Sequence, residues 1–405
     1  MKTLLLISDA TSAYYDENGS LYFGNSFSPH VWQRYLKIAD KIQFICRKSA
    51  KIYTEKEAKH QFQESPSDNI EVLFVSNPRE SLSNYLSLKI KKKNRQIFKN
   101  AIKDSDLIII RTLGSVNTSF VINEIKKDKK KYMCECIGDN FEAMWTYGLT
   151  GKLLAPKSYF DQRKLIKNAS YVMYVTSIFL QKRYPTIGKN IGVSDVKINE
   201  LTEKQKYECI SRRRNLKNKN RIKLVTVGSL QDRSKGQKYV IKAIKILKEK
   251  GISNLEYHIL GGGDKTKLES LAEKYGVSDK VIFDGQVKHE EVFNIIDKMD
   301  IFILSSLSEG LPRAIIEAMS RGLPCIGTNV GGIPELVSSK YLFTKNKNKI
   351  SREIAQKIEI LINKDSIEDE VKYSLQKASE FEKEKLDVKR RKFMKEFRDD
   401  ILALN

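Results

Sequence analysis

The feature that most constrains this sequence is a repeated alternation of short apolar runs with longer, mostly polar segments. In the first half of the chain, runs long enough for a buried strand are separated by segments long enough for a helix. These runs lie at residues 3–7, 41–46, 70–75, 107–111, 131–137 and 171–175. A parallel sheet requires this order, because each strand must return to the same edge of the sheet through a crossover connection. The pattern therefore predicts an α/β chain whose parallel sheets are covered by helices.

The same alternation restarts in the second half, after a charged stretch. Residues 199–220 are rich in Lys, Arg and Asn and poor in large apolar clusters, so we expect an exposed linker there. A chain of 405 residues can form two domains with separate cores. We expect a first Rossmann-like domain at residues 1–205 and a second at 206–384. In the second, the pattern predicts strands at 223–227, 255–260, 280–283 and 301–304, and helices at 237–249, 265–275 and 290–298.

Two glutamates eight residues apart, Glu309 and Glu317, bracket the expected start of a helix. The apolar run 301–304 precedes them as a strand, and Gly310 with Pro312 marks a turn and the first helical position. A helix N-terminus carries unpaired N–H groups and a partial positive charge, which suit the diphosphate of an activated sugar. Glu309 would stand at the mouth of such a site, and Glu317 could bind ribose hydroxyls. A solvated helix face would explain the two glutamates equally well if they stood alone.

This stretch continues through an Arg321-Gly-Leu-Pro-Cys segment to Gly331, Gly332 and Glu335, and it resembles the retaining glycosyltransferases of family 4. Their signature is two glutamates with seven residues between them inside an apolar strand, turn and helix. The resemblance is strong over 221–337 and diffuse before it. It implies the GT-B fold, in which two Rossmann-like domains face a central cleft, the first binding the acceptor and the second the nucleotide sugar.

In that family the last helix crosses back onto the first domain. Residues 385–405 could do so here, because their apolar side chains share roughly one helical face. These side chains are Leu386, Phe393, Phe397 and Ile401.

The family's diphosphate clamp is a Gly-Arg-Leu sequence followed, after a few residues, by Lys-Gly. Here Gly228 and Lys235 match that pattern, but Ser229 replaces the arginine. The replacement removes a bidentate guanidinium, unless Arg233 reaches in from the same loop. A surface lysine in a turn is the plain alternative for Lys235.

Further positions in the second domain correspond to the donor site of the resembled family. Gly261 and Gly263 match a Gly-x-Gly pair beside the donor, although a strand-to-helix turn would also explain them. Gly285 and Gln286 follow the strand whose end meets the nucleobase. Because Pro312 lacks an N–H group, backbone donors at the glutamate turn would come from neighbours. The expected donor-binding set is Gly228, Ser229, Arg233, Lys235, Gly261, Gly263, Gly285, Gln286, Glu309, Gly310, Leu311 and Glu317.

The expected catalytic residues are Glu309, Lys235 and Asp139. Asp139 follows a strand of the first domain, where ligands gather at carboxyl ends. Several relatives carry a histidine nearby; this chain has none there, and Asp139 is the nearest ionisable group. It could orient the acceptor hydroxyl or accept its proton, with Trp145 as a stacking face for a sugar. An Asx turn beside a buried tryptophan is the alternative.

No metal or cofactor is expected beyond the nucleotide sugar, which is a substrate. The five cysteines are odd in number and scattered, and Cys134 with Cys136 lacks a second pair of ligands for zinc. Asp104 and Asp106 imitate a metal-binding Asp-x-Asp, but they precede an apolar strand as a turn would.

The 73 Lys and Arg residues against 50 Asp and Glu give a formal charge of +23, which attracts anionic partners. Basic residues concentrate at 89–99 and 126–131. The first segment carries a partial apolar stripe, so a membrane-surface contact competes with the interpretation of a solvated, lysine-rich helix. The stripe comprises Leu82, Leu86, Ile90, Ile97 and Ala101. Nucleic acid is disfavoured as a partner, because the lysine runs lack interleaved aromatic residues.

The first apolar run is too short for a signal peptide, and no stretch is long enough to span a bilayer. We therefore expect a cytoplasmic protein, peripheral on the inner face of the membrane if the basic segments bind lipid.

The resemblance implies a retaining transfer of sugar from a nucleoside diphosphate, with UDP favoured, to an acceptor hydroxyl. In the family's usual mechanism, the departing diphosphate oxygen deprotonates that hydroxyl. A lipid-linked glycan in bacterial surface-polysaccharide assembly is the expected acceptor. The alternatives are a sugar-nucleotide epimerase of the same architecture, a phosphorylase, for which the cofactor-lysine context is missing, and a non-catalytic basic protein that binds nucleic acid.

Overall fold

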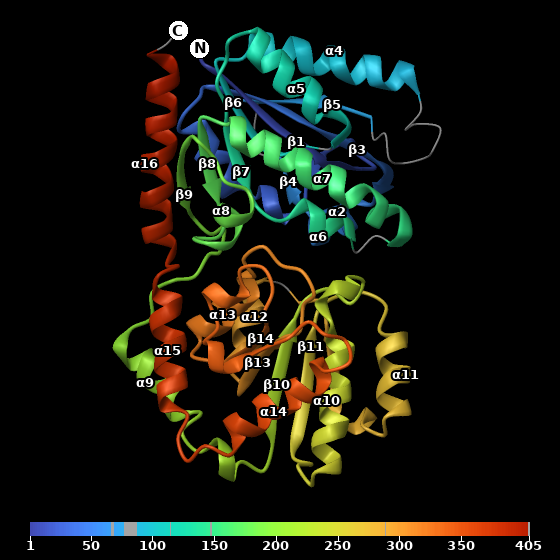
Figure 1. Ribbon diagram of the computed structural model, residues 1–405, viewed down its shortest axis with the longest axis vertical. Coiled ribbons are helices and arrows are strands. Elements are labelled where there is room, and N and C mark those ends of the chain that lie inside the picture. The colour runs from blue at the N-terminus through green and yellow to red at the C-terminus, as the bar shows by residue number, and fades with distance from the viewer. Residues whose placement is uncertain (66–68, 77–86, 114, 146–147, 288, 404–405) are drawn as a thin grey trace. The chain divides into compact units, whose positions relative to one another are not determined.

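The computed structural model describes residues 1–65, 69–76, 87–113, 115–145, 148–287 and 289–403. The chain forms two compact units. Unit 1 comprises Met1–Val175, Gln181–Val193 and Val388–Asn405, and unit 2 comprises Thr176–Leu180 and Ser194–Asp387. Each unit is built on a largely parallel sheet with helices around it (Figure 1), so the expected α/β class is confirmed.

The sheet of unit 1 has a parallel core in the order β5-β3-β1-β6-β7-β8-β9. Two short strands, β2 and β4, extend it with antiparallel pairing. β1, β6 and β8 contain runs of buried apolar residues, as strands covered on both faces must. The bounds are β1 Thr3–Asp16, β2 Leu21–Phe23, β3 Lys41–Tyr53, β4 Gln63–Glu64, β5 Ile70–Phe74, β6 Leu107–Thr112, β7 Met133–Cys136, β8 Tyr171–Tyr174 and β9 Lys189–Gly192.

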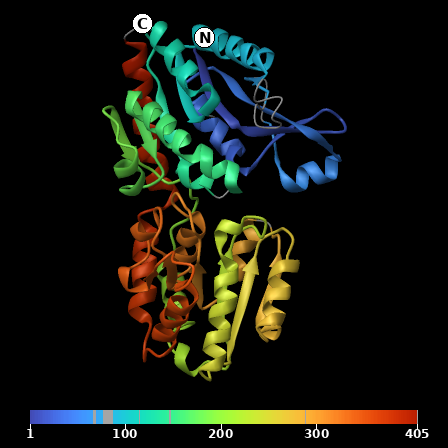
Figure 2. The ribbon, with the colours of Figure 1, turned by 45° about the vertical axis from the view of Figure 1, so that its right-hand side comes forward.

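β1 and β3 run well beyond the apolar segments that the sequence marked as strands. Their outer halves join β2, β4 and a capped helix, α2, in an extension of the sheet (Figure 2, blue). Tyr14 stacks on Phe62 there, with ring centroids 3.9 Å apart. The outer half of β1 is mostly half-buried and that of β3 is mostly exposed, so neither shows the buried apolar run that predicts a core strand.

The helices of unit 1 are α1 Pro29–Leu36, α2 Glu55–Gln61, α4 Leu88–Asp104, α5 Ser115–Lys127, α6 Asn140–Trp145, α7 Gly148–Asn168, α8 Phe179–Arg183 and α16 Lys383–Leu402. α8 and α16 each begin in unit 2 and continue in unit 1.

The lysine-rich helix α4 uses its apolar residues inside the fold. Phe98, Ala101 and Ile102 are buried, whereas Ile90 and Ile97 are half-buried. Leu82 and Leu86 of the expected stripe lie outside the described residues. The stripe that suggested a lipid contact is therefore largely the inner face of the helix, and its lysines cover the solvent side.

Unit 2 contains a six-stranded parallel sheet, within the described residues, in the order β12-β11-β10-β13-β14-β15. α10 packs against α11 and α14, whereas α13 packs against α12 and α15, so helices cover both faces. The strands are β10 Ile222–Val227, β11 Leu255–Leu260, β12 Val281–Gly285, β13 Ile301–Leu304, β14 Cys325–Thr328 and β15 Leu342–Phe343. The helices are α9 Glu203–Ser211, α10 Gln237–Glu249, α11 Thr266–Lys274, α12 His289–Ile296, α13 Arg313–Ser320, α14 Ile350–Ile362 and α15 Glu368–Ser379.

Most residues of the expected exposed linker at 199–220 are exposed, but the segment is anchored to unit 2 and is not a free linker. It contains α9, which packs against α15, and Arg213 is fully buried. The Arg213 guanidinium donates to the carbonyl oxygens of Met299, at 2.9 and 3.1 Å, and Cys209, at 3.1 Å. Charged residues in a sequence usually indicate exposure. A planar guanidinium can nevertheless be buried where carbonyl oxygens accept its hydrogen bonds.

The end of the chain, in α16, packs on the β8 and β9 side of unit 1. The ring of Tyr171 lies 5.2 Å from that of Phe393 and 5.5 Å from that of Phe397. Lys189 pairs with Glu396 at 2.6 Å and with Asp400 at 3.0 Å. An aromatic core flanked by ion pairs thus holds the last helix to strands more than two hundred residues earlier in the chain.

We predict that Phe397→Ala lowers the free energy of unfolding of unit 1 by about 3–5 kcal/mol, because Phe397 is fully buried against Tyr171. Urea denaturation followed by circular dichroism would measure this. Val388→Ala is the matched control, since Val388 is 57% exposed on the same helix. Equal unfolding curves for the two variants would contradict the packing described.

Candidate functional site

The strand order of unit 2 reverses between β10 and β13. From β10 the chain moves through β11 to β12 on one side, and then returns to β13 on the other. In doubly wound sheets, ligands bind at the carboxyl ends of the strands where the order reverses. Two loops lie at that point, 228–236 after β10 and 305–312 after β13. Both were selected from the sequence as candidate donor-binding loops.

The two loops are joined by hydrogen bonds at several levels. Below them, the Thr226 hydroxyl donates to the Ile303 carbonyl at 2.7 Å. The Leu307 N–H donates to the Ser234 carbonyl at 2.7 Å, and the Ser305 hydroxyl donates to the Gly236 carbonyl at 2.8 Å. The loop ends therefore have fixed positions relative to each other.

Gly236 is required by this junction. Its φ is +72°, and a Cβ atom there would lie 2.2 Å from the Ser305 carbonyl oxygen. No other residue type meets both conditions without strain. The glycine of the Lys-Gly pair thus has a structural reason. Because Gly236 has no side chain, the backbone of the β13 loop can lie directly against it, next to Lys235.

Lys235 and Glu309 meet across the two loops. The Lys235 Nζ atom lies 2.7 Å from the Glu309 Oε1 atom, and the side chains are 24% and 10% exposed. Such a pair is more strongly coupled than an ion pair in open solvent, because less water screens it. The structure therefore brings together the two residues expected to act on the leaving group and on the donor sugar.

The glycine triplet 261–263 lies against the β10 loop. The Gly228 N–H donates to the Leu260 carbonyl at 2.8 Å, and the Gly261 N–H donates to the Gly285 carbonyl at 2.8 Å. A Cβ atom on Gly261 would lie 2.1 Å from the Gly228 carbonyl oxygen, and Gly263 has a φ of +126°. Close packing between the loops requires glycine at these positions, and it places Gly228, Gly261 and Gly285 beside one another.

Gln286 lies next to the same triplet. Its Oε1 atom would be 2.7 Å from a Cβ atom on Gly262. The expected nucleobase-binding pair, Gly285 and Gln286, is therefore adjacent to the expected Gly-x-Gly pair.

The turn after Glu309 is shaped by the loop that contains Gly331 and Gly332. The Gly332 N–H donates to the Gly310 carbonyl at 2.7 Å. Gly331 has a φ of +56°, and a Cβ atom there would lie 2.0 Å from the Glu309 carbonyl oxygen. These glycines thus set the path of the backbone that carries Glu309.

α13 begins one residue later than expected, with Pro312 as its N-cap and Arg313 as its first residue. Leu311 is buried beside this start. Glu317 lies in the second turn and is only 7% exposed. A solvated helix face is therefore excluded for Glu317, because the residue is buried.

Ser229 links two parts of the expected donor site. Its Oγ atom accepts a hydrogen bond from the Gln231 N–H at 3.2 Å, and its hydroxyl lies 3.5 Å from the Gly262 carbonyl oxygen. Arg233 lies in a short 3-10 segment, Arg233–Lys235, but its side chain is outside the described part of the structure.

Sequence reasoning missed the role of Glu335, at the end of the Gly331 loop. Its carboxylate accepts hydrogen bonds from the N–H groups of Ser177 at 2.7 Å, Ile178 at 3.2 Å and Phe179 at 2.7 Å. It therefore caps the start of α8, as an anion at a helix N-terminus does. In the sequence, the available indication is a charged residue, Glu335, directly after a Gly-Gly-Ile-Pro turn.

Asp139, expected among the catalytic residues, is held by several hydrogen bonds within unit 1. Its carboxylate accepts from Arg183 Nε at 2.6 Å, from the Tyr184 hydroxyl at 2.5 Å and from the Phe141 N–H at 2.9 Å. Burial, reinforced by the charge of Asp139, raises the pKa of Tyr184, so this hydroxyl stays protonated and donates. With these donors around it, Asp139 forms the Asx turn that was its alternative interpretation.

Trp145, in contrast, is not buried. It is 45% exposed and stacks on Phe141 with centroids 5.2 Å apart and ring planes 21° apart. Its exposed face keeps the expectation of a stacking surface open, while the buried-tryptophan alternative is wrong.

All five cysteines are free and buried, as expected for reduced core residues. Burial raises the pKa of Cys136 to about 12 and that of Cys134 well above its ordinary value, so both thiols stay protonated. Among the described residues, no group of three or more His, Cys, Asp or Glu side chains is arranged to hold a metal ion.

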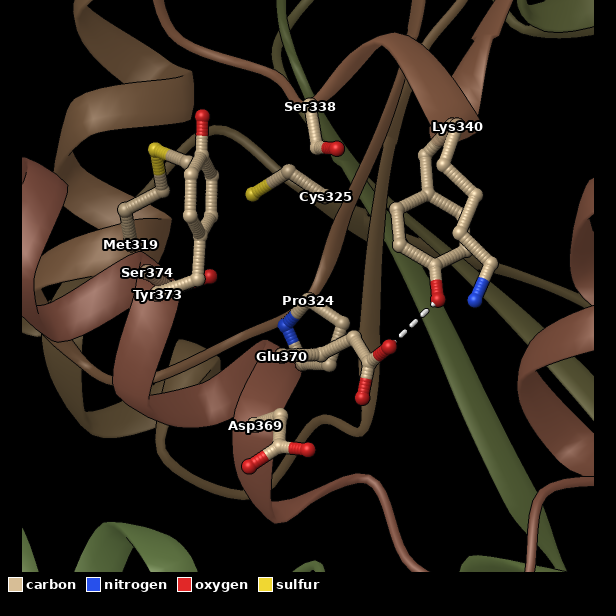
Figure 3. A pocket seen from close by; sticks show the side chains of 10 residues that line it. Met319, Pro324, Cys325, Ser338, Lys340, Asp369, Glu370, Tyr373 and Ser374 are labelled. Atoms are coloured by element: carbon tan, nitrogen blue, oxygen red, sulfur yellow. Dashed lines mark hydrogen bonds between the residues drawn. The ribbon is translucent and has the colours of Figure 1, made fainter.

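A separate cavity of about 140 Å³ lies at the opposite edge of the unit 2 sheet (Figure 3). It is lined by Cys325, the first residue of β14, and by residues of α15, including Glu370, which accepts a hydrogen bond from the Tyr341 hydroxyl at 2.7 Å. Sites for ligands of drug size typically occupy about 300–1,000 Å³. Its size and its place at the amino ends of the strands separate this cavity from the loops that carry Lys235 and Glu309.

Comparison with known proteins agrees with this geometry. Residues 209–378 match the family described as glycosyl transferases group 1. Protein CapJ of Staphylococcus aureus is 31% identical over 401 residues, covering 96% of this chain and 94% of CapJ. The chain belongs to the group 1 glycosyltransferases. A second relative of this glycosyltransferase is the putative colanic acid biosynthesis glycosyltransferase WcaL of Escherichia coli, 35% identical over 147 residues, or 34% of this chain and 35% of WcaL.

Solved structures share the fold. Sucrose-phosphate synthase from Thermosynechococcus elongatus aligns with a TM-score of 0.69 and 16% identity, over 100% of both chains. The Anabaena protein HepE, solved with UDP, aligns with a TM-score of 0.64 and 15% identity, over 99% of this chain and 100% of HepE. The architecture of this glycosyltransferase is thus that of the GT-B enzymes.

We predict that Gly261→Ala and Gly262→Ala differ sharply, although the residues are adjacent. A methyl group on Gly261 meets the Gly228 backbone oxygen, whereas one on Gly262 meets the mobile end of the Gln286 side chain. Overpacking against backbone should cost about 1–3 kcal/mol of unfolding free energy in unit 2. Thermal denaturation would measure this, and a Gly262→Ala variant as unstable as Gly261→Ala would contradict the loop packing.

Proposed function

We propose that this glycosyltransferase moves a sugar from a UDP-sugar to an acceptor hydroxyl with retention of anomeric configuration, as a member of family 4, and needs no metal ion. The observation that carries the proposal is the contact between Lys235 and Glu309 at the switch point of unit 2. The structure of HepE with UDP supports the choice of nucleotide, since HepE shares this fold.

The geometry suggests how the two residues would act in turn. In the free protein, the ammonium group of Lys235 is held by the Glu309 carboxylate. A diphosphate carries more negative charge than a carboxylate and would attract Lys235 toward it. Glu309 would then be free to accept hydrogen bonds from hydroxyls of the donor sugar. The ion pair thus positions both groups before the substrate arrives.

The chemical step needs positive charge near the leaving group. As the bond from the sugar to the diphosphate breaks, negative charge grows on the phosphate oxygens, and preorganised donors lower the barrier most where that charge develops. Lys235, the backbone N–H groups at the start of α13, and Arg233 would supply it. The diphosphate oxygen would take the proton of the acceptor hydroxyl, so no protein nucleophile is required.

The remaining donor contacts follow from the positions of the loops. Glu317 would bind the ribose hydroxyls, and Gly285 with Gln286 would meet the nucleobase. Gly228, Ser229, Gly261, Gly263, Gly310 and Leu311 would bring backbone groups near the donor. In this assignment residues 206–384 bind the donor and 1–205 bind the acceptor.

For the acceptor we propose a lipid-linked glycan of bacterial surface-polysaccharide assembly, used at the inner face of the cell membrane. The resemblance to WcaL, a putative colanic acid biosynthesis glycosyltransferase, supports this class of acceptor. Among the described residues, no helix is both long enough and apolar enough to cross a bilayer. Saturation-transfer NMR with a panel of nucleotide sugars would identify the donor, and absence of any UDP-sugar signal would refute the proposal.

We predict that Glu309→Gln lowers kcat about 100-fold or more, a loss typical of removing one group that stabilises the transition state. UDP binding should be unchanged or stronger, because the substitution removes the carboxylate that competes for Lys235. Steady-state kinetics and calorimetric titration with UDP would separate the two effects. Unaffected turnover would show that Glu309 has no part in the reaction.

We predict that Lys235→Ala weakens UDP binding about 10-fold or more, since it removes a charge-assisted hydrogen bond to the diphosphate. Lys245→Ala is the matched control, because Lys245 pairs with Glu249 at 3.3 Å on the outside of α10 in the same unit. Calorimetric titration would compare the variants. Equal affinity for UDP in the two would place the diphosphate elsewhere.

We predict that chelation with EDTA leaves turnover within about twofold of the untreated enzyme, because Lys235 and backbone donors supply the charge that a metal ion provides in other transferases. Product formation with EDTA, and again after addition of excess Mg²⁺, would test this. A loss that Mg²⁺ restores would mean that the reaction depends on a metal.

A further inference from the structure

Helix α7 of unit 1 has its largest apolar residues on the outside. Leu149 is 80% exposed, Leu153 is 81% exposed and Phe160 is 67% exposed. The spacing of four and seven residues places all three on one helical face. The opposite, buried face carries mostly small or polar residues together with two aliphatic ones, namely Gly151, Ala155, Ser158, Gln162, Leu165 and Ile166. Single exposed apolar residues are common, but a stripe of them along one helix marks an interaction surface.

Neighbouring segments extend the stripe. Ile187, 84% exposed in the loop before β9, lines the same open hollow as Phe160. At the other end, Trp145 is 45% exposed, and Lys152 Nζ lies 5.7 Å from the centre of its ring. The exposed apolar side chains therefore recur from one end of α7 to the other; the helix is labelled in Figure 1.

Positive charge surrounds this stripe. Exposed cationic side chains of α7 lie beside it or in the last turns of the helix, and they are Lys152, Lys157, Arg163, Lys164 and Lys167. One acidic residue on the helix is nearby, Asp161, and it pairs with Lys157 at 2.5 Å. A helix with apolar residues on its outer face and cations around them has the composition of segments that lie in a membrane interface.

The lysine-rich helix α4 differs from α7 in the burial of its apolar residues. Its outward face is basic, but most of its apolar residues are turned inward, and Leu88 at its start is the large apolar residue that is strongly exposed. Charge alone attracts α4 to any anionic surface, whereas α7 also offers side chains that can enter the acyl region.

We propose that the outer face of α7, with Trp145 and Ile187, docks this protein onto an anionic lipid bilayer. The inference deepens the proposed function, on which it rests, by assigning the surface through which the enzyme reaches a lipid-linked acceptor. A second copy of the chain fits this face less well, because a symmetric contact would bring the two basic borders together, and like charges facing each other are unfavourable. Anionic lipid headgroups complement the same border.

Vesicle flotation with the full-length protein tests the assignment. Vesicles of phosphatidylcholine with phosphatidylglycerol should carry the protein upward, and vesicles of phosphatidylcholine alone should carry far less. The combined variant Leu149→Ser, Leu153→Ser and Phe160→Ser should lower the apparent affinity for the anionic vesicles by roughly tenfold or more, since it removes the side chains that enter the bilayer.

Two charge variants separate α7 from the general basicity of the chain. Lys152→Ser with Lys164→Ser and Lys167→Ser should weaken binding by up to about 100-fold, at roughly fivefold for each charge near an anionic surface. The matched control removes three exposed lysines of α4, Lys92, Lys93 and Lys99, each to Ser. It should weaken binding less than about threefold.

Tryptophan fluorescence gives a second readout. The chain has two tryptophans, and Trp32 is fully buried, so a blue shift on addition of anionic vesicles reports Trp145. Trp145→Phe should abolish the shift while leaving flotation largely intact.

Three outcomes would overturn the proposal. The first is failure of the wild type to float with anionic vesicles, and the second is flotation of the apolar variant equal to that of the wild type. The third is a dimer in size-exclusion chromatography that the apolar variant dissociates, without flotation of the wild type. UDP binding measured without vesicles is the independent check on the proposed function. It should be equal in wild type and the α7 variants, so its absence in the wild type would refute the donor assignment and leave the docking result standing.

Discussion

The hydrogen bonds that join the β10 loop to the β13 loop hold the candidate site together. Lys235 and Glu309 are separated by 74 positions in the sequence, yet their charged atoms lie 2.7 Å apart. This approach is possible because Gly236 has no side chain where the Ser305 carbonyl passes and because the Ser305 hydroxyl bonds to the Gly236 carbonyl. A lysine and a glutamate on flexible loops would lose much of their attraction to conformational entropy. Here the hydrogen-bonded loops are already ordered by folding, so forming the ion pair loses less conformational entropy.

The same principle extends to two neighbouring loops. Gly261 lies under the carbonyl of Gly228, and Gly331 lies under the carbonyl of Glu309. At each contact, the absence of a glycine side chain lets the neighbouring backbone approach closely. The glycines that drew attention in the sequence therefore position the charged residues, whether or not their own amides touch a ligand. Glycine-rich loops at a nucleotide site can act first as structural spacers for the cation and the carboxylate.

The sequence was most informative where structure is local. β11, β13 and α10 begin and end at the residues expected, because buried apolar runs and amphipathic periodicity need no knowledge of the rest of the chain. Contacts between residues far apart in the sequence could not be predicted in this way. They include the pairing of the outer halves of β1 and β3, the burial of Arg213 by carbonyl oxygens, and the capping of α8 by Glu335. Asp139 shows the same limit, since its Arg183 and Tyr184 partners follow it by 44 and 45 residues. The exposed stripe of α7 was hidden because a helix pattern indicates an apolar face without telling which face the core takes.

The return of α16 to unit 1 bears on how the chain folds during synthesis. Residues from Val388 onward belong to unit 1, although all of unit 2 from Ser194 precedes them. A ribosome releases the chain from its N-terminus, and domains generally fold as units in that order. Unit 1 would remain incomplete, with Tyr171 uncovered, until unit 2 had been synthesised and α16 could pack against Tyr171. Unit 1 would then be finished only after α16 has been synthesised, so chains that stop before α16 would be open to chaperones and proteases.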